Sequence, residues 1–513
     1  TATNRPTEYM ASESLDFSGA TWQPYGTAPS FTLSFGVGGR MVYFKLRGAD
    51  GQESEVASDT IFVLPDTVSV GTGTFTMGRT ASGDDALYGT ADELPQHEVT
   101  LGAYQIGKYE VTNKEYCDVL NWAKAKGYLY TDVAGTPWTG LGFIYAGGTA
   151  DSRYVIGAFS STYHIQYSGG VFTSKTSVGL PGTTIYAMDT HPMVHLSWYG
   201  AVAFCNWLSE WQGLTPCYDM NSPEWPLTIA PATPGGYRLP TEAEWERAAA
   251  WESAGGGKHW IYSFISDTLT GKDRANYIDH NPSFVNPLGL TSDPYTSPAG
   301  WFNGVNVSPN GSVATVDSPS PVGAYDMSGN VSEMCHDRFS NTYYSGGAMT
   351  NPTGPATGSS RVVRGGSYLA AHDYSRSAKR MTSNPTDMNR SFGFRLAKSE
   401  PSVGMTSFAI NNGDATTTLP TVTLNNTCWG APTEYMASEF SDFSGAIWQP
   451  YDTAPSFSLS SGEGGTKTIY FKVRFAGGES ATVSDTIELT GRTVTLPGDV
   501  PLELVWVPSG SFQ

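Results

Sequence analysis

Basic side chains are scarce in this chain, and their scarcity excludes one class of partner. The chain has 29 lysine and arginine residues against 48 aspartate and glutamate residues, and its formal net charge is −19. Because no basic stripe is present to neutralise phosphates, we expect no nucleic-acid partner. The excess of acidic residues is in accord with a protein that lies outside the cell or on its surface, or with one that binds cations. An acidic surface that only maintains solubility explains the charge equally well.

Long apolar runs and clustered metal ligands are also missing. No run of about 18 apolar residues occurs, so the sequence predicts no membrane span. The five cysteines show neither CxxC nor Cys/His ligand spacing, which argues against zinc, and their odd number leaves at least one thiol without a partner in this chain. No HExxH motif and no GxSxG elbow occurs, so neither a zinc protease nor a serine hydrolase is indicated.

What is abundant is glycine, with 58 residues, and aromatic side chains, at 13% of the chain. This mixture is typical of a β-rich and loop-rich protein with aromatic anchors. A length of 513 residues suits about two to four domains, each able to bury a core.

An internal repeat is the clearest feature of the organisation. Residues 6–29 recur almost letter for letter at 432–455, where Trp22 matches Trp448, and residues 42–47 and 58–61 recur at 469–474 and 484–487. The alternation of apolar and polar residues with glycine and proline punctuation predicts short antiparallel strands. Each copy therefore resembles a bacterial Ig-like or fibronectin-like β-sandwich.

The second copy is longer at its start. Residues 404–430 read as opening strands that the first copy lacks, and residues 502–512 resemble the segment 71–78 that opens the middle of the chain. We expect Thr1 to lie inside a sandwich and the chain to be one period of a tandem array. The alternative is a naturally short chain with frayed ends.

The expected domains follow from these comparisons. Residues 1–64 form an N-terminally incomplete Ig-like sandwich, 65–400 a large middle domain, 401–492 a second Ig-like sandwich, and 493–513 the start of a further middle-domain repeat. Three helices are expected in the middle domain. They begin after Thr112 and Thr241, each the first residue of a capping box, and after Ser197.

A series of ordered landmarks runs through residues 65–400. They are Gly73 to Gly78, Glu93 to Val99, Tyr109 to Asn113, His191-Pro192, Val194 to Trp198, Tyr237 to Glu246, Tyr325 to Val331, Arg364 to Ser367, and Gly393-Phe394-Arg395. Together they resemble the formylglycine-generating enzyme, or sulfatase-modifying factor, family. The resemblance implies an α+β, loop-rich fold with a C-type-lectin-like core between the two all-β Ig-like sandwiches.

The family's catalytic chemistry uses two cysteines, five residues apart, that hold copper and follow the Gly-Gly-Ser segment. The matching positions here are Ala370 and Ser375. Alanine offers no ligand, and a serine hydroxyl is a poor copper(I) ligand and no redox group. From the resemblance we expect no copper, no catalytic residue and no enzymatic activity.

Members of the family also stabilise their long loops with calcium. The resemblance therefore implies calcium sites in this chain. One site would use Asn276, Tyr277, Asp293 and Tyr295, and a second Asn330, Val331 and Glu333. Calcium takes oxygen ligands from carboxylates, amides and carbonyls in irregular loops, in accord with these residue types. The alternative is that these side chains only cap turns.

The usual family disulfide is incomplete here. Cys205 matches one of its positions, but the other holds Leu396. We expect Cys205 to be a buried free thiol, with a local pair between Cys205 and Cys217 as the alternative.

Two functions are weighed. The first is a non-catalytic structural repeat protein outside the cell, which would self-associate or contact neighbouring repeats in a fibre, sheath or surface layer. The second is an adhesin or lectin-like surface protein that binds a glycan or protein ligand. The residues expected to present its binding face are Tyr368, His372, Asp373, Tyr374, Arg376 and Arg380. An enzyme with altered oxidase chemistry is the least favoured reading.

Overall fold

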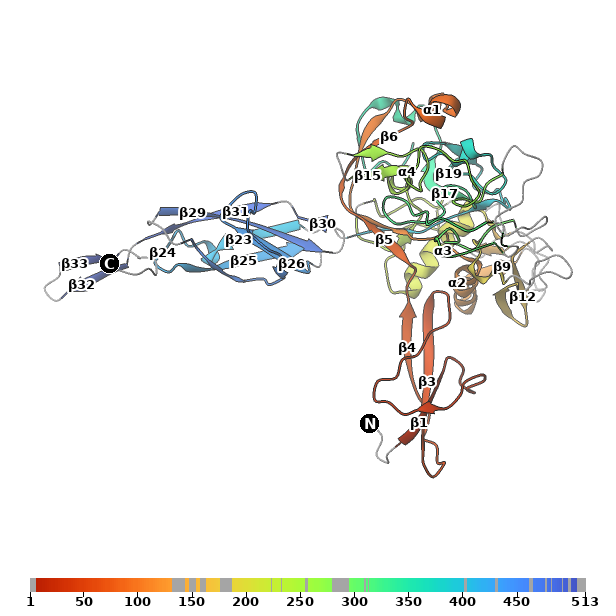
Figure 1. Ribbon diagram of the computed structural model, residues 1–513, viewed down its shortest axis with the longest axis horizontal. Coiled ribbons are helices and arrows are strands. Elements are labelled where there is room, and N and C mark those ends of the chain that lie inside the picture. Colours follow the sequence, from red (N-terminus) through yellow and green to blue (C-terminus); the bar gives the residue numbers. More distant parts are fainter. Residues whose placement is uncertain are drawn as a thin grey trace.

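A computed structural model shows three bodies along the chain: a lone sheet, a large middle domain and a two-sheet module (Figure 1). It describes residues 6–131, 144–146, 154–156, 163–175, 187–222, 224–231, 233–253, 257–278, 295–308, 311, 313–400, 404–429, 432–460, 465–475, 478–480, 482–490, 492–496 and 500–504. The predicted calcium ligand Asp293 and residues 505–513 of the expected further repeat lie outside these ranges.

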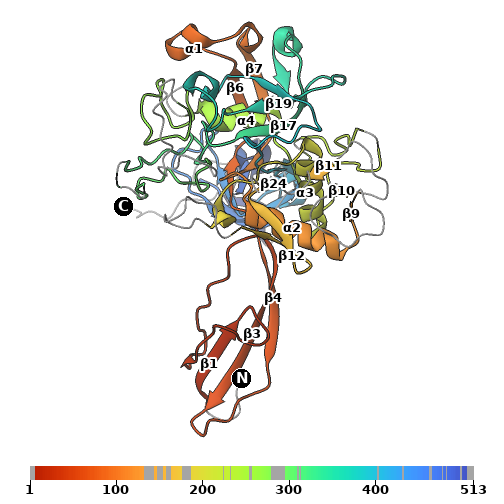
Figure 2. The ribbon, with the colours of Figure 1, turned by 90° about the vertical axis from the view of Figure 1, so that its right-hand side faces the viewer.

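The first body is an antiparallel sheet of strand order β2-β1-β3-β4. Its strands are β1 (Pro6–Ser12), β2 (Gln23–Pro24), β3 (Gly38–Gly48) and β4 (Ala57–Val63). Figure 2 shows the sheet projecting from the middle domain, which it meets at the ends of β3 and β4. There Phe62 packs edge-on against Trp211 at 5.5 Å, and Arg40 pairs with Asp118 at 2.8 Å.

The middle domain combines short sheets with three longer helices. All three helices begin where the sequence predicts, at α2 (Asn113–Ala125), α3 (Trp198–Trp211) and α4 (Glu242–Ala250). Thr112 and Thr241 each close a complete capping box. Helix α4 is buried along its whole length and α3 along most of it, and the aromatic residues of α3 belong to the largest apolar core.

The remaining elements of this domain are short. They are β5 (Thr67–Val70), β6 (Gly73–Met77), α1 (Gly83–Tyr88), η1 (Ala91–Glu93), β7 (His97–Leu101), β8 (Tyr104–Gly107), β9 (Leu129–Thr131), β10 (Ile144–Ala146), β11 (Tyr154–Ile156), β12 (Ile165–Ser168), β13 (Val171–Ser174), η2 (Met188–Thr190), β14 (Tyr237–Arg238), β15 (Trp251–Glu252), β16 (Lys258–His259), β17 (Ser332–Arg338), η4 (Tyr343–Gly346), β18 (Met349–Thr350), β19 (Arg361–Arg364), η5 (His372–Ser375), β20 (Met381–Ser383), β21 (Phe392–Gly393) and β22 (Ala397–Ser399).

Two sheets position the closing segment of the domain. In the order β14-β22-β8-β5, the last strand of the domain shares a sheet with its first. In the order β20-β19-β17-β21, strand β19 leads directly into Gly365 and Gly366, the start of the closing segment. The second sheet lies over α4, whose residues contact both β17 and β19.

The third body holds two sheets around one apolar core. A three-stranded sheet contains β23 (Gly404–Ile410), β25 (Thr421–Trp429) and β28 (Ser456–Ser458). The larger sheet contains β24 (Thr416–Thr417), β26 (Glu434–Ser438), β27 (Gln449–Pro450), β29 (Gly465–Phe475), β30 (Gly478–Glu479) and β31 (Val483–Leu489). The 3-10 turn η6 (Asn411–Gly413) follows β23, and a separate hairpin, β32 (Arg492–Leu496) with β33 (Val500–Leu504), follows the module. Assignment of either flanking body to the Ig-like class stays a prediction.

Candidate functional site

The closing segment turns sharply after β19. Gly365 and Gly366 both have positive φ angles, 90° and 70°, in the left-handed region that favours glycine. A Cβ on Gly366 would lie 2.6 Å from the Ser375 Oγ and 2.9 Å from its backbone nitrogen. The glycine pair therefore lets residues 366 and 375, the two ends of the segment, approach each other.

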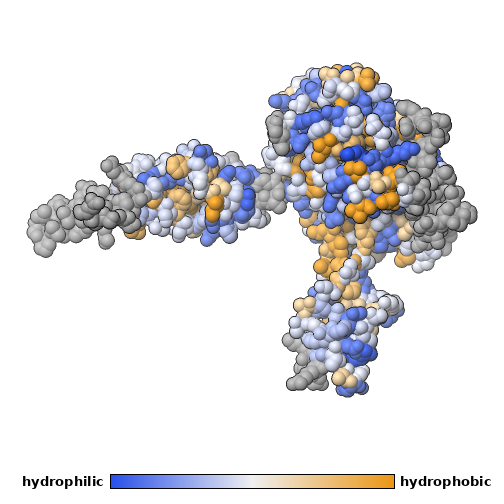
Figure 3. Space-filling model, in the orientation of Figure 1, coloured by the Kyte–Doolittle hydropathy of each residue, from blue (hydrophilic) through white to orange (hydrophobic). Residues whose placement is uncertain are grey.

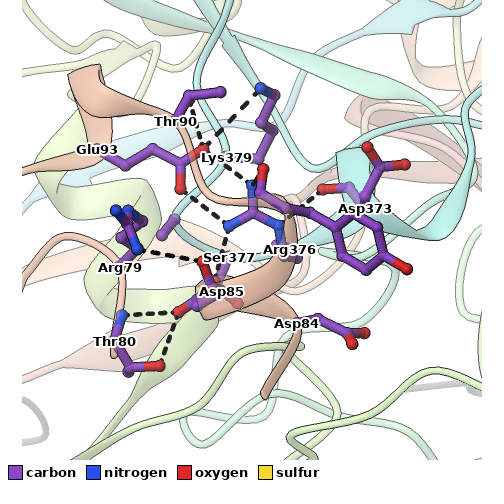
Figure 4. A network of polar contacts seen from close by, with 12 residues as sticks. Arg79, Thr80, Asp84, Asp85, Thr90, Glu93, Asp373, Arg376, Ser377 and Lys379 are labelled. Carbon is purple, nitrogen blue, oxygen red and sulfur yellow. Dashed lines mark hydrogen bonds and ion pairs between the residues drawn. The ribbon is translucent and has the colours of Figure 1, made fainter. Parts of the chain in front are cut away.

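Arg376 anchors the segment to the N-terminal part of the domain (Figure 4). Its Nη1 donates to the Asp85 carboxylate at 2.7 Å, and both Nη1 and Nη2 donate to Glu93 at 2.9 Å. Its Nε donates to the carbonyl of Asp373 at 3.0 Å. Burial alone would lower the pKa of Arg376, but the Glu93 and Asp85 carboxylates raise it above its ordinary value. The guanidinium therefore stays charged and fixes η5 against α1 and η1.

A second buried network continues this anchoring. Arg380 binds the Glu242 carboxylate through Nε at 2.7 Å and Nη2 at 2.8 Å. Arg364 also reaches Glu242, through Nη1 at 3.1 Å, and donates to Glu246 at 2.5 Å. These arginines come from the closing segment and its strand, whereas both glutamates come from α4. The segment is thus held by ion pairs at both ends.

Above the Arg376 network lies an exposed surface formed by Leu87, Tyr88, His372 and Tyr374, which we call the α1–η5 surface. Leu87 is 74% exposed, and Tyr88 and Tyr374 are each 43% exposed. The Tyr88 and His372 rings meet edge to face at 5.2 Å, and the Tyr88 carbonyl accepts from Arg376 at 3.2 Å. Apolar and aromatic side chains are thus exposed to solvent next to the buried ion pairs of Arg376 with Asp85 and Glu93.

The structure corrects the predicted binding face in part. Tyr368, Arg376 and Arg380 are buried and are therefore not part of an exposed face. Tyr368 stacks on Tyr295 at 5.7 Å, and its hydroxyl donates to the Arg390 carbonyl at 3.1 Å. Of the predicted residues, His372 and Asp373 are half-buried and Tyr374 is exposed.

The contribution of α1 to this surface was not predicted from the sequence. A local signal was present, because Ser82 is followed three residues later by Asp85 in the pattern of a capping box. In the structure the Ser82 side chain caps nothing, and the Asp85 carboxylate instead accepts from Thr80 and Arg376. The pattern predicts the start of the helix. It does not predict the ion pair of Asp85, because the partner, Arg376, is distant in the sequence.

The two positions that match the family's cysteines do not fit a copper ion. Ala370 is half-buried and carries no ligand atom, and Ser375 is fully buried and offers only a hydroxyl. All five cysteines are free and lie elsewhere, and within the described ranges no group of three or more His, Cys, Asp or Glu residues could hold a metal ion. Ala370 and Ser375 therefore do not form a copper–thiolate pair.

The first predicted calcium site has one feature that fits a hard cation. Asn276 is fully buried, and its amide nitrogen donates to the Tyr295 carbonyl at 2.9 Å, whereas no donor among the described residues faces its Oδ1 atom. A buried oxygen without a donor suits a hard cation. Tyr277, next along the chain, is also buried. Calcium here stays a prediction.

The residues of the second predicted site have protein partners. Both Glu333 oxygens accept from Arg395 at 2.6 Å, and the Asn330 Oδ1 accepts from the Ser297 backbone nitrogen at 2.9 Å. The Asn330 amide donates to Glu110, whose pKa is raised well above its ordinary value by burial and then by Asp326 and Glu333. Val331 is buried beside them. The sequence did not predict the Glu333–Arg395 pair, and calcium at this site also stays a prediction.

The cysteines follow the expectation from the sequence. Cys205 is a buried free thiol on α3, and Cys217 is buried and free as well, so the alternative local disulfide is not formed. Burial raises the pKa of both thiols, which keeps them protonated and unreactive.

A cavity of about 610 Å³ lies where the first sheet meets the middle domain. Its wall includes Leu64 from the first body and Tyr109, Glu115 and Trp301 from the second. Hydrophobic residues gather on the visible surface at this junction (Figure 3). This cavity is separate from the α1–η5 surface, because none of Leu87, Tyr88, His372 and Tyr374 lines it.

One family model matches the middle domain, and several known proteins are similar to about two thirds of the chain. Residues 52–400 match the model of the family described as sulfatase-modifying factor enzyme 1-like domain. A formylglycine-generating enzyme of Streptomyces coelicolor is 29% identical over 334 residues, covering 63% of this chain and 86% of that protein. One of Bos taurus is 26% identical over 339 residues, covering 64% and 74%. The structure of Treponema denticola variable protein 1 is 23% identical with a TM-score of 0.40, covering 67% of this chain and 96% of that one.

These names overturn one expectation from the sequence. The relatives that align with about two thirds of the chain are named as enzymes, so the expectation that the domain has no enzymatic activity is wrong as drawn. Replacement of two cysteines does not by itself show an inactive domain. The names also lend no support to a structural fibre. No helix in the described part of the chain is long and apolar enough to cross a membrane.

Proposed function

The chain belongs to the sulfatase-modifying factor enzyme 1-like family, and from this premise we propose that it binds an extended polypeptide segment on the α1–η5 surface. The observation that carries the proposal is the exposure of Leu87, Tyr88 and Tyr374 directly above the buried Arg376 network. Exposed tyrosines on a rigid base are effective binding residues, because little conformational entropy is lost when they pack against a partner.

The nature of the ligand follows from the family and from the chemistry of the surface. The family description names a factor that modifies a sulfatase, and a sulfatase is itself a polypeptide. Tyr88 and Tyr374 offer both an apolar ring and a hydroxyl, and Lys379 lies 5.4 Å from the Tyr374 ring centroid. A segment with apolar or aromatic side chains and an acidic group suits this combination better than a nucleic acid does.

We also propose that calcium supports the loop that carries Asn276, and that the protein acts outside the cell or on its surface. The Asn276 Oδ1, which has no donor within the described part of the chain, supports the first of these, and the net charge of −19 is in accord with both. Calcium at Asn276 would act on the α1–η5 surface indirectly, because the Ile278 backbone nitrogen donates to the Ala370 carbonyl at 2.9 Å.

Selection from a random peptide library displayed on phage, with the full chain as bait, tests this function. We expect enrichment of a shared sequence pattern, and weaker binding of the enriched peptides to the Tyr88→Ala and Tyr374→Ala variants. Mass spectrometry of synthetic copies after incubation with the chain then shows whether a residue in them is modified. Enriched peptides that bind both variants as tightly as the parent chain would contradict the proposal.

A further inference from the structure

Two arginines lie opposite each other on neighbouring strands of the middle domain. In the antiparallel pair of β17 and β19, Arg338 is the register partner of Arg361. Figures 1 and 2 both show the two strands side by side. Like charges directly opposite each other destabilise a sheet. The pair is therefore unexpected in a chain of net charge −19, where basic residues are few.

A β-bulge separates this pair from the next one along the strands. Met334 pairs with Val363, so residues 335–337 of β17 stand opposite the single residue 362 of β19. His336 is the middle residue of the bulge, and its carbonyl accepts from the Arg361 Nη1 at 2.7 Å. Bulges redirect side chains and often occur next to functional sites. Here His336, Arg338 and Arg361 all line one cavity.

This cavity has a volume of about 330 Å³, at the lower end of the range for small-molecule sites. Its other walls come from two loops, within residues 226–231 and 353–356. Gly354 has a φ of 78°, and a Cβ there would lie 2.8 Å from the Asp337 Cβ, so the second loop lies directly against β17. The loops supply the apolar part of the wall, from Pro226, Leu227, Pro231, Pro355 and Ala356.

Arg361 is a buried cation that has no carboxylate partner in the described part of the chain. It is 4% exposed, and its Cζ lies 3.6 Å from the ring centroid of Trp198. A guanidinium carries five N–H donors, but with the described residues Arg361 makes only its hydrogen bond to the His336 carbonyl. Burial and the nearby Arg338 lower the pKa of Arg361 to about 10, so it stays charged at neutral pH. A buried charge is costly unless it is paired, and a bound anion would supply the missing partner.

Arg338 has only a weak ionic partner. Its Nη1 donates to the Ala356 carbonyl at 2.9 Å, and its Nη2 lies 3.4 Å from the carboxylate of Glu224. The Glu224 side chain is mostly exposed, and a long, exposed ion pair of this kind contributes little to stability. A ligand with a negative charge can therefore take the place of Glu224 at low cost.

His336 adds a polar group that carries no charge. Its ring is buried, and its Nδ1 has no hydrogen-bond partner among the described residues. Burial, and then the nearby Arg361, lower the pKa of His336 well below its ordinary value. The neutral ring has one nitrogen that donates and one that accepts, so it can bond to a ligand without adding positive charge.

We propose that this cavity, which we call the Arg338–Arg361 site, binds a small organic anion with an oxyanion head group, carboxylate or phosphate, on a short apolar body. The oxygens would bridge the two guanidinium groups and displace Glu224, because arginine forms charge-assisted hydrogen bonds with both kinds of oxyanion. The apolar body would lie against the prolines of the two loops. The site is separate from the α1–η5 surface, since no residue of that surface lines the cavity.

Isothermal titration calorimetry of the full chain with phenyl phosphate and with benzoate tests the proposal. We expect saturable binding of at least one of the two anions at one site per chain, and the tighter of the two identifies the head group. Benzamide, which has a neutral head group, should bind more weakly than benzoate, and inorganic phosphate, which has no apolar body, more weakly than phenyl phosphate. Saturable binding of neither anion would overturn the proposal.

Two substitutions with opposite effects separate binding from folding. Arg338→Gln removes one guanidinium and should weaken binding about tenfold or more. Glu224→Gln removes the competing carboxylate and should tighten binding about threefold, which a damaged fold would not do. Arg474→Gln is the matched control, because Arg474 is a partly exposed arginine of the third body, paired with Glu434 at 2.6 Å. Equal affinities in the parent chain and the first two variants would overturn the proposal, as would an equal loss in Arg338→Gln and Arg474→Gln.

Discussion

The Arg376 guanidinium meets the Glu93 carboxylate through two parallel hydrogen bonds of 2.9 Å, although 283 residues separate the two in the sequence. Both side chains are fully buried, and Asp85 completes the charge balance on the other side of the guanidinium. This contact holds the closing segment against α1 and η1, and so determines the shape of the surface that we propose to bind a polypeptide.

Arg376→Ala should strongly destabilise the middle domain. The substitution leaves Asp85 buried without the arginine and leaves Glu93 with only the longer contact to Lys379 at 3.9 Å. Breaking a buried pair in this way typically costs about 3–5 kcal/mol. Urea unfolding followed by tryptophan fluorescence measures the effect. Arg338→Ala is the control, because Arg338 pairs at 3.4 Å with Glu224, which is mostly exposed, and such pairs contribute about 1 kcal/mol or less. Equal losses in the two variants would contradict the assignment.

Gly366→Ala should distort the closing segment. Gly366 has a φ of 70°, and an added Cβ would clash with the backbone of Ser375 at 2.9 Å. Gly213→Ala separates the two effects, since Gly213 has a φ of 74° and open space around it. We expect the control to lose about 1–2 kcal/mol from backbone strain alone and Gly366→Ala to lose more. Thermal unfolding of the two variants provides the comparison.

His191 should make the middle domain sensitive to acid. Burial, reinforced by the nearby His164, lowers the pKa of His191 from its ordinary 6.5 to about 3. Below pH 6.5 the unfolded chain binds a proton at this residue that the folded chain does not, so stability falls with falling pH until about pH 3. The slope is about 1.4 kcal/mol per pH unit. In His191→Gln, the loss of stability between pH 7 and pH 5 should shrink, as measured by urea unfolding; an unchanged loss would show that His191 titrates normally.

Removal of calcium should lower the melting temperature of the parent chain. The loop that carries Asn276 is held to Ala370 through Ile278, so loss of an ion there loosens the closing segment. In Asn276→Ala the melting temperature should no longer respond to a calcium chelator. Differential scanning calorimetry with and without added calcium measures both effects. A chelator response that persists in the variant would place the ion elsewhere.

Tyr374→Ala should weaken the binding of library-selected peptides by about 2 kcal/mol, or roughly thirtyfold, as expected for a tyrosine at the centre of an interface. Tyr374 is exposed, so its truncation should not alter the fold. Tyr25→Ala is the matched control, because Tyr25 is 37% exposed and belongs to the first body. Fluorescence anisotropy with a labelled peptide compares the two variants, and equal affinities would exclude Tyr374 from the interface.

Local signals predicted the parts of the fold that depend on neighbouring residues. The helix starts at Thr112 and Thr241 followed from capping boxes, which need only residues three positions apart. The repeat was also visible in the sequence, and the matching strands pair in the same register, β1 with β3 and β26 with β29.

The site was harder to predict because its contacts are distant in sequence. Tyr368 and Arg380 carry polar groups and so were expected at the surface. In the structure Tyr368 stacks on Tyr295, and Arg380 pairs with Glu242. Neither partner is close in the sequence. The carboxylate of Glu333 is a group that often binds calcium. In the structure it instead accepts from Arg395, which is 62 positions away in the sequence. Residue type alone does not distinguish an ion ligand from a partner in a buried ion pair.

Hydrogen exchange of the full chain, with and without a library-selected peptide, tests the central claim most directly. We expect protection concentrated in α1 and in residues 369–376, with the wall of the cavity at Tyr109 and Trp301 unchanged. Protection of the cavity wall instead, with α1 and η5 exchanging as fast as in the free chain, would contradict binding at the α1–η5 surface.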